Sequence, residues 1–418
     1  MKVLLKQVTI VNSSSPFNGL AKDIYIKDGI ITAIADSITE KADEVIDIKN
    51  LSVSIGWMDS FAHFCDPGFE YRETLESGAK AAAAGGFTEV MVLPNTNPVI
   101  HSKSQIEYII QKSKDFSVTI HPIGAITKNA EGKELAEMYD MHQSGAIAFS
   151  DGIYSIQQPG ILLKALQYVL AFDGTVIQLP EDKSISPHGL MNEGIISTQL
   201  GLPGKPAIAE ELMIARDIEL VKYTGSKIHF TGVSTKNSIE LIAKAKADGL
   251  KVSCSITPYH IFFCDEDLVT YDTNLKVNPP LRTKEDMLAL REAVKKGTID
   301  CFASHHIPQN TDGKICEFEY AKNGMIGLET LFAAALSVTG NAAVLVEYLS
   351  VASRKIFGSR IPELKEGASA NLTLFDSTKE FIFDDSMIRS KSANSAFIGK
   401  KLKGKVIGII NGNKLELN

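Results

Sequence analysis

Polar side chains able to carry acid–base or metal chemistry follow an apolar strand pattern early in the chain. Residues 51–55 have this pattern and lead into Asp59 and His63. Carboxylates and imidazoles serve as general acids, general bases and metal ligands. A second apolar run, residues 88–93, ends at the turn containing Asn95. Because barrels built of strand–helix units carry their chemistry where the strands end, this stretch is a candidate site.

A helix pattern separates these two runs and completes one strand–helix–strand unit. Residues 74–84 are rich in alanine and begin with charged side chains. Gly85-Gly86 then ends the helix pattern, because glycine adopts the positive φ at which many helices close. The stretch from Gly56 to Val99 is therefore predicted to fold as strand, helix and strand.

The middle of the chain continues this alternation, which predicts βαβ units and a parallel sheet. With the first two strands the predicted strands number eight, enough to close a barrel. We therefore predict an α/β fold with a TIM-type (β/α)8 barrel over residues 54–359. The further strand candidates are 118–122, 146–150, 175–179, 227–231, 251–256 and 298–303, and helix candidates include 160–171, 209–224, 234–248 and 284–296.

Both ends of the chain have short strand patterns punctuated by Asn, Asp and Gly, which predict small β-structures. Asn411-Gly412-Asn413 is typical of a hairpin turn near the C-terminus. We expect residues 1–53 and 360–418 to pair into one composite β-sandwich, mainly because the family identified below is built that way. Two separate β appendages are the alternative.

The composition is that of an ordinary globular protein, with 418 residues, 44% hydrophobic and 22% charged. A net charge of −7 argues against nucleic acid or an anionic membrane as partner. Five scattered cysteines without a CxxC pair favour reduced thiols and a cytoplasmic location. The first residues are typical of a strand rather than a signal peptide, and no apolar run reaches the ~18–20 residues of a membrane span.

Several short motifs together resemble those of class I dihydroorotases in the amidohydrolase superfamily. Two residues depart from that pattern: Phe61 stands where the family has its first histidine, and Cys65 where it has an arginine. The matching residues are Asp59, His63, Asp66-Pro67-Gly68, Gly85-Gly86-Phe87-Thr88 and Pro94-Asn95-Thr96.

The resemblance implies a zinc centre with ligands from six places. Zinc would acidify a bound water and polarise the amide carbonyl of the substrate. Two of the six positions keep a ligand, and four are changed. His63 and Asp151 are kept; the changed positions carry Phe61, Leu179, Gly232 and His305, the last where the family has its catalytic aspartate. Asn95 and Asn278 keep substrate-binding positions, whereas Gln309 replaces a histidine.

The remaining polar residues permit more than one interpretation. His63 and Asp151 are either a remnant zinc pair or polar residues hydrogen-bonded to each other or to water. His305 and His306 are adjacent, so on a strand their side chains would point to opposite faces. A new centre of His63, Asp151 and His305, with or without Cys65, is the chemically conceivable alternative. We expect no bound metal, and zinc only if the site functions.

Three other charged features have simpler interpretations. Glu181-Asp182 is expected to be a solvated pair in a loop. Lys128 and Arg282 are basic residues that could bind an anion, but exposed basic residues usually bind nothing specific.

Two classes of function follow from the resemblance. The first is a non-catalytic homologue in pyrimidine synthesis that scaffolds aspartate transcarbamoylase, as loss of ligands within an intact fold suggests. The alternative is an active metal-dependent cyclic amidohydrolase that interconverts dihydroorotate and N-carbamoyl aspartate or hydrolyses a related cyclic amide. A homo-oligomer is expected in either case.

Overall fold

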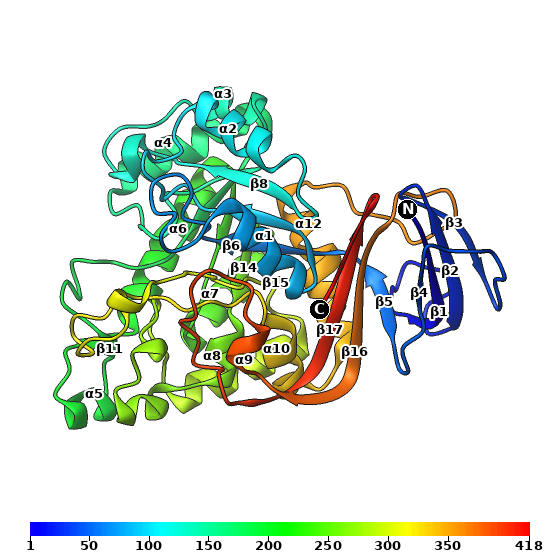
Figure 1. Cartoon of the computed structure of the whole chain (residues 1–418). Coiled ribbons are helices and arrows are strands. Elements are labelled where there is room, and N and C mark those ends of the chain that lie inside the picture. The colour runs from blue at the N-terminus through cyan, green and yellow to red at the C-terminus, as the bar shows by residue number, and fades with distance from the viewer.

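A closed barrel of eight parallel strands forms the centre of the molecule (Figure 1). The computed structural model describes all residues, 1–418. The first strand meets the segment after the last one, where His63 N donates to His306 O at 2.8 Å, and this contact closes the barrel. In sheet order the strands are β6 (Trp57–Ala62), β7 (Phe87–Val92), β8 (Thr119–Gly124), β9 (Ala148–Phe149), β10 (Thr175–Gln178), β13 (Lys227–Phe230), β14 (Val252–Ile256) and β15 (Cys301–Phe302).

Helices surround this barrel, and local sequence fixes where several of them begin and end. Thr74 caps the first helix by accepting from Ser77 N, and Gly225 ends α6 in the left-handed conformation. The helices are α1 (Leu75–Ala84), α2 (Lys103–Ser113), α3 (Met138–Gln143), α4 (Pro159–Val169), α5 (Ile195–Leu200), α6 (Ile208–Thr224), α7 (Lys236–Ala247), α8 (Pro258–Phe262), α9 (Lys284–Lys296), α10 (Leu331–Thr339), α11 (Ala342–Glu347) and α12 (Ser353–Phe357).

The barrel core is apolar on both faces of its sheet. One large cluster lies between the strands and the surrounding helices, and a smaller cluster fills the barrel interior. Phe61 and Met91 belong to the interior cluster and are almost fully buried. Burial of this apolar surface is a main source of the stability of the barrel.

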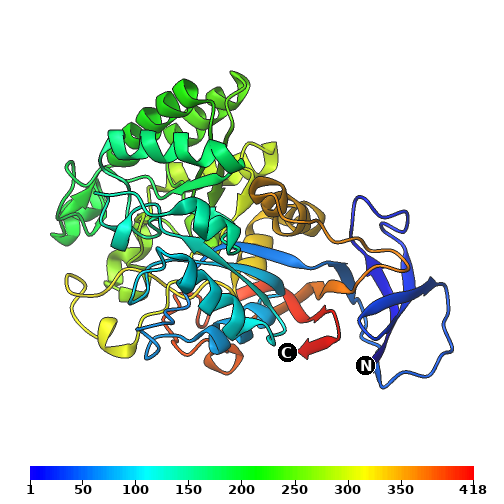
Figure 2. The same cartoon turned by 90° about the horizontal axis from the view of Figure 1, so that it is seen from above.

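Strands from both ends of the chain share a second sheet of eight strands, which extends away from the barrel (Figures 1 and 2). This confirms the predicted barrel with a separate sheet from the termini, and a hairpin does turn at Gly412-Asn413. β16 pairs with both β5 and β17 and so joins the two ends. The strands are β1 (Lys2–Ile10), β2 (Ala21–Lys27), β3 (Ile30–Ala35), β4 (Glu44–Ile46), β5 (Ser52–Ile55), β16 (Asn371–Ile382), β17 (Lys401–Asn411) and β18 (Lys414–Leu417).

Two insertions that the sequence pattern does not predict rise over one end of the barrel. The first follows β10 and contains α5 between the paired short strands β11 (Met191–Asn192) and β12 (Gly204–Lys205). The second follows β15 and runs over residues 307–326 with little regular structure. None of the helices combines the length and apolar character needed to cross a membrane.

Candidate active site at the barrel mouth

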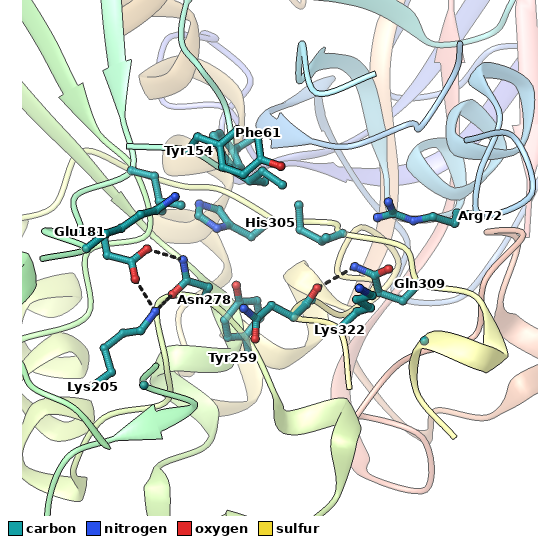
Figure 3. Close-up of a pocket in the computed structure, with 18 of the residues that line it drawn as sticks. Phe61, Arg72, Tyr154, Glu181, Lys205, Tyr259, Asn278, His305, Gln309 and Lys322 are labelled. Carbon is teal, nitrogen blue, oxygen red and sulfur yellow. Dashed lines mark hydrogen bonds and ion pairs between the residues drawn. The ribbon is translucent and has the colours of Figure 1, made fainter. Parts of the chain in front are cut away.

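A cavity of about 910 Å³ opens at the carboxyl ends of the barrel strands (Figure 3). Its walls come from the strand ends and from the two insertions. Six residues singled out from the sequence line it: Phe61, Leu179, Glu181, Asn278, His305 and Gln309. Five others do not line it: His63, Cys65, Asn95, Asp151 and Gly232. The structure thus brings only part of the predicted set together around the cavity.

Phe61 and His305 form an aromatic stack at the floor of the cavity. Their ring centroids are 4.3 Å apart and the rings are nearly parallel. His305 Nε2 lies 2.8 Å from Thr231 Oγ1, and burial lowers the His305 pKa well below its ordinary value. The imidazole is therefore neutral, packed and hydrogen-bonded to the protein.

Gly232 leaves the space that the His305 ring occupies. A Cβ on Gly232 would lie 2.6 Å from His305 Cε1, and the glycine has a φ of +70°. The position where the family has a ligating histidine thus has neither a side chain nor room for one.

His63 is buried and hydrogen-bonded within its own segment. Its Nδ1 accepts from Cys65 N at 2.9 Å, and burial together with the nearby Arg72 charge lowers its pKa to about 3. Asp59 lies in β6, four residues before His63. It accepts from Ser304 N at 2.6 Å and from Ser304 Oγ at 2.8 Å. Asp59 therefore joins the first strand to the segment after the last one instead of facing the cavity.

Asp151 is held by a neighbouring strand end. Its two oxygens accept from Thr127 N at 2.9 Å and Thr127 Oγ1 at 2.5 Å. Burial raises the Asp151 pKa to about 6. Asn95 Nδ2 donates to the Asp151 carbonyl at 3.0 Å. No hydrogen bond joins Asp151 to His63, so of the alternatives considered for this pair the mutual hydrogen bond is not formed.

The side chains present do not fit a zinc ion at the six positions. Phe61, Leu179 and Gly232 have no donor atom, and zinc normally takes three or four protein ligands. No group of three or more His, Cys, Asp or Glu side chains in the chain is arranged to hold a metal. The conceivable centre of His63, Asp151 and His305 is thus not assembled.

A buried ion pair on one side of the cavity was missed by the sequence interpretation. Lys205 forms a close ion pair with Glu181 and donates to Asn278 Oδ1 at 2.7 Å, and Asn278 Nδ2 donates to Glu181 at 3.0 Å (Figure 3). The prediction of a solvated Glu181 is wrong, because the β12 insertion covers it. Burial opposes ionisation, but the Lys205 charge holds the Glu181 pKa below its ordinary value.

The two adjacent histidines point apart, but not through strand alternation, because they follow the end of β15 and His305 has a φ of +43°. His305 faces the cavity, whereas buried His306 lies 3.3 Å from Glu73 and accepts from Gly327 N through Nδ1. Arg282 is not an exposed basic residue; it is buried and donates to Asn192 and other neighbours.

Fold comparison defines the class of protein first. The L-hydantoinase (dihydropyrimidinase) from Arthrobacter aurescens superposes with a TM-score of 0.86 over 100% of this chain and 97% of its own, at 24% identity. A D-hydantoinase gives 0.81 over 100% and 95%, at 21% identity. At these identities the likeness shows the fold alone, a (β/α)8 barrel with a sheet built from the termini.

Sequence comparison then gives the family. Residues 52–238 match the family model described as dihydro-orotase-like. The dihydroorotase of Acetivibrio thermocellus is 41% identical over 418 residues, covering 98% of both chains. That of Syntrophus aciditrophicus is 38% identical over 414 residues, covering 97% of both. The chain belongs to the dihydroorotase family.

Proposed function

We propose that the chain serves pyrimidine biosynthesis as a dihydroorotase homologue that does not hydrolyse amides through a zinc centre. One observation carries this proposal: three of the six ligand positions, occupied by Phe61, Leu179 and Gly232, offer no donor atom. The donors that remain at His63 and Asp151 are engaged by hydrogen bonds within the protein.

The buried titratable groups that face the cavity, Glu181 and His305, are both engaged by other side chains and so are poor bases for activating water. Glu181 is the buried carboxylate that faces it, and its ion pair with Lys205 lowers its basicity. His305 is stacked against Phe61 and already lies within hydrogen-bond distance of Thr231. These contacts support binding of a ligand better than its hydrolysis.

An active cyclic amidohydrolase is the second candidate, and the relatives favour it. The curated proteins that match nearly the full length are named dihydroorotase, and this name supports an enzyme more directly than a scaffold. Such an enzyme would be metal-dependent and would interconvert dihydroorotate and N-carbamoyl aspartate, or hydrolyse a related cyclic amide.

Zinc content and turnover measured on one preparation separate the two candidates. For the purified chain we expect well under one zinc per chain after dialysis and no dihydroorotase turnover, with or without added zinc. Phe61→His should not restore activity, because ligands that act as a unit are not additive. About one zinc per chain, with turnover that a chelator abolishes, would establish the active enzyme. Asp151→Asn is the control that shows whether any zinc found depends on this site.

We further propose aspartate transcarbamoylase as a partner and a cytoplasmic location, which five unpaired thiols support. Co-expression followed by size-exclusion chromatography tests the partner. Separate elution of the two chains at micromolar concentration would refute the scaffold.

A further inference from the structure

The mouth cavity is cationic in a protein that is acidic as a whole. Arg72, Lys183 and Lys322 line it and form no ion pair, whereas Asp312 is the one lining acid without a cationic partner. The net charge of the chain is −7. A concave site of opposite sign to the rest of the protein concentrates anions, so the cavity is suited to a negatively charged ligand.

Aromatic side chains form much of the remaining wall. Tyr71 and Tyr154 line the cavity and are 60% and 46% exposed. Phe61 and Tyr259 also line the cavity, but both side chains are buried. Exposed rings on the wall of a cavity offer faces on which a planar ligand stacks.

The unpaired cationic side chains and the hydrogen-bonded Lys205–Asn278–Glu181 cluster lie on different sides of the cavity. In Figure 3, Arg72 and Lys322 lie on one side, and the Lys205–Asn278–Glu181 cluster lies on the opposite side. This cluster presents N–H donors and carboxylate lone pairs together. A ligand that spans the cavity therefore meets cations at one end and mixed donors and acceptors at the other.

We propose that the cavity binds a nucleoside monophosphate. The phosphate lies toward Arg72 and Lys322, the planar ring stacks near Tyr154, and the polar edge of the ring faces Lys205 and Asn278. The volume of about 910 Å³ exceeds what a small dicarboxylate would fill and lies within the range of pockets that hold larger ligands. The proposal rests on the proposed function only in that no metal occupies the cavity.

Isothermal titration calorimetry of the full-length chain tests this site, with uridine 5′-monophosphate as the probe. We expect saturable binding of one molecule per chain at about 0.15 M salt. Uridine, which lacks the phosphate, and ribose 5-phosphate, which lacks the ring, should each bind at least about tenfold more weakly, because each loses one of the two contact types. The zinc content of the same sample is measured, so that failure of the proposed function is recognised separately.

Single variants locate the ligand. Lys322→Ala should weaken binding of the monophosphate about fivefold and leave uridine unaffected. Tyr154→Ala should weaken both. Lys355→Ala removes an exposed lysine away from the cavity and should change neither. Both targeted side chains are exposed, so the variants are expected to fold.

Three results would overturn the proposal. Equal affinity for inorganic phosphate and the monophosphate would show an adventitious ion only. Tighter binding of succinate than of the monophosphate would identify a dicarboxylate site. Absence of binding by the monophosphate at millimolar concentration would show that the cavity does not recognise nucleotides.

Discussion

Gly232→Ala tests whether the family position for a histidine is closed by packing. Gly232 and Gly225 share a φ of +70°, so an alanine has the same backbone strain at both positions. A Cβ at Gly225 meets nothing within 4 Å, whereas at Gly232 it lies 2.6 Å from His305 Cε1 and 3.2 Å from Nε2. The comparison of the two variants therefore measures the packing around Gly232, in which the clash with His305 is the closest contact.

The clash should destabilise Gly232→Ala by about 2–3 kcal/mol more than Gly225→Ala. Overpacking in a core costs about 1–3 kcal/mol, and displacement of the His305 ring from Thr231 loses a hydrogen bond worth about 1 kcal/mol. Urea unfolding followed by circular dichroism and by the fluorescence of Trp57, the single tryptophan, measures the difference. In a His305→Ala background the difference should shrink to the part due to Pro279 Cδ, which lies 3.3 Å from the same Cβ. Equal destabilisation of the two glycine variants would refute the packing argument.

Three further predictions concern groups outside the cavity. Arg354→Met should destabilise the chain by about 3–5 kcal/mol in the same urea assay, because the buried guanidinium is within 2.7 Å of both Glu89 and Gly56 O, and its loss leaves His121 as the only partner of a buried carboxylate. Burial opposes ionisation of Glu89, but His121 and Arg354 lower its pKa from 4.5 to about 2. Between these two pH values the unfolded state binds more protons than the folded state, so the free energy of unfolding should fall as the pH drops from about 4.5 toward 2. Glu89→Gln should reduce that loss. A thiol reagent at neutral pH should modify one cysteine per native chain, the partly exposed Cys316, since the other four are buried; two or more rapidly reacting thiols would contradict this.

The barrel was largely predictable because its signals are local. Strand 175–178 and helix 284–296 coincide closely with the predicted 175–179 and 284–296, since apolar periodicity and capping residues lie within each segment. β15 is shorter than predicted, at Cys301–Phe302 against 298–303; Asp300 N still donates to Cys254 O at 3.1 Å, but regular pairing with β14 is confined to Cys301 and Phe302.

The mouth was less predictable because its contacts join segments far apart in sequence. The motif positions of Phe61 and His305 showed which ligands had changed, but not that the two rings stack. Lys205 belongs to no recognisable sequence motif. Its ion pair with Glu181 forms only because the insertion that contains β12 folds over the cavity. Charged residues such as Arg72 become part of a site only through the shape of the wall around them.

The joining of the two chain ends in one sheet has a consequence for synthesis on the ribosome. β1–β5 leave the ribosome first, yet β5 pairs with β16 near the other end of the chain. Trp57 N, just after β5, donates to Thr373 Oγ1, 316 positions later. At the usual rate of translation, that separation corresponds to roughly 15–60 s. The edge of β5 is without its final partner for this interval, while the barrel between the two segments has time to fold. Completion of the chain, rather than emergence of its first strands, therefore determines when the terminal sheet closes.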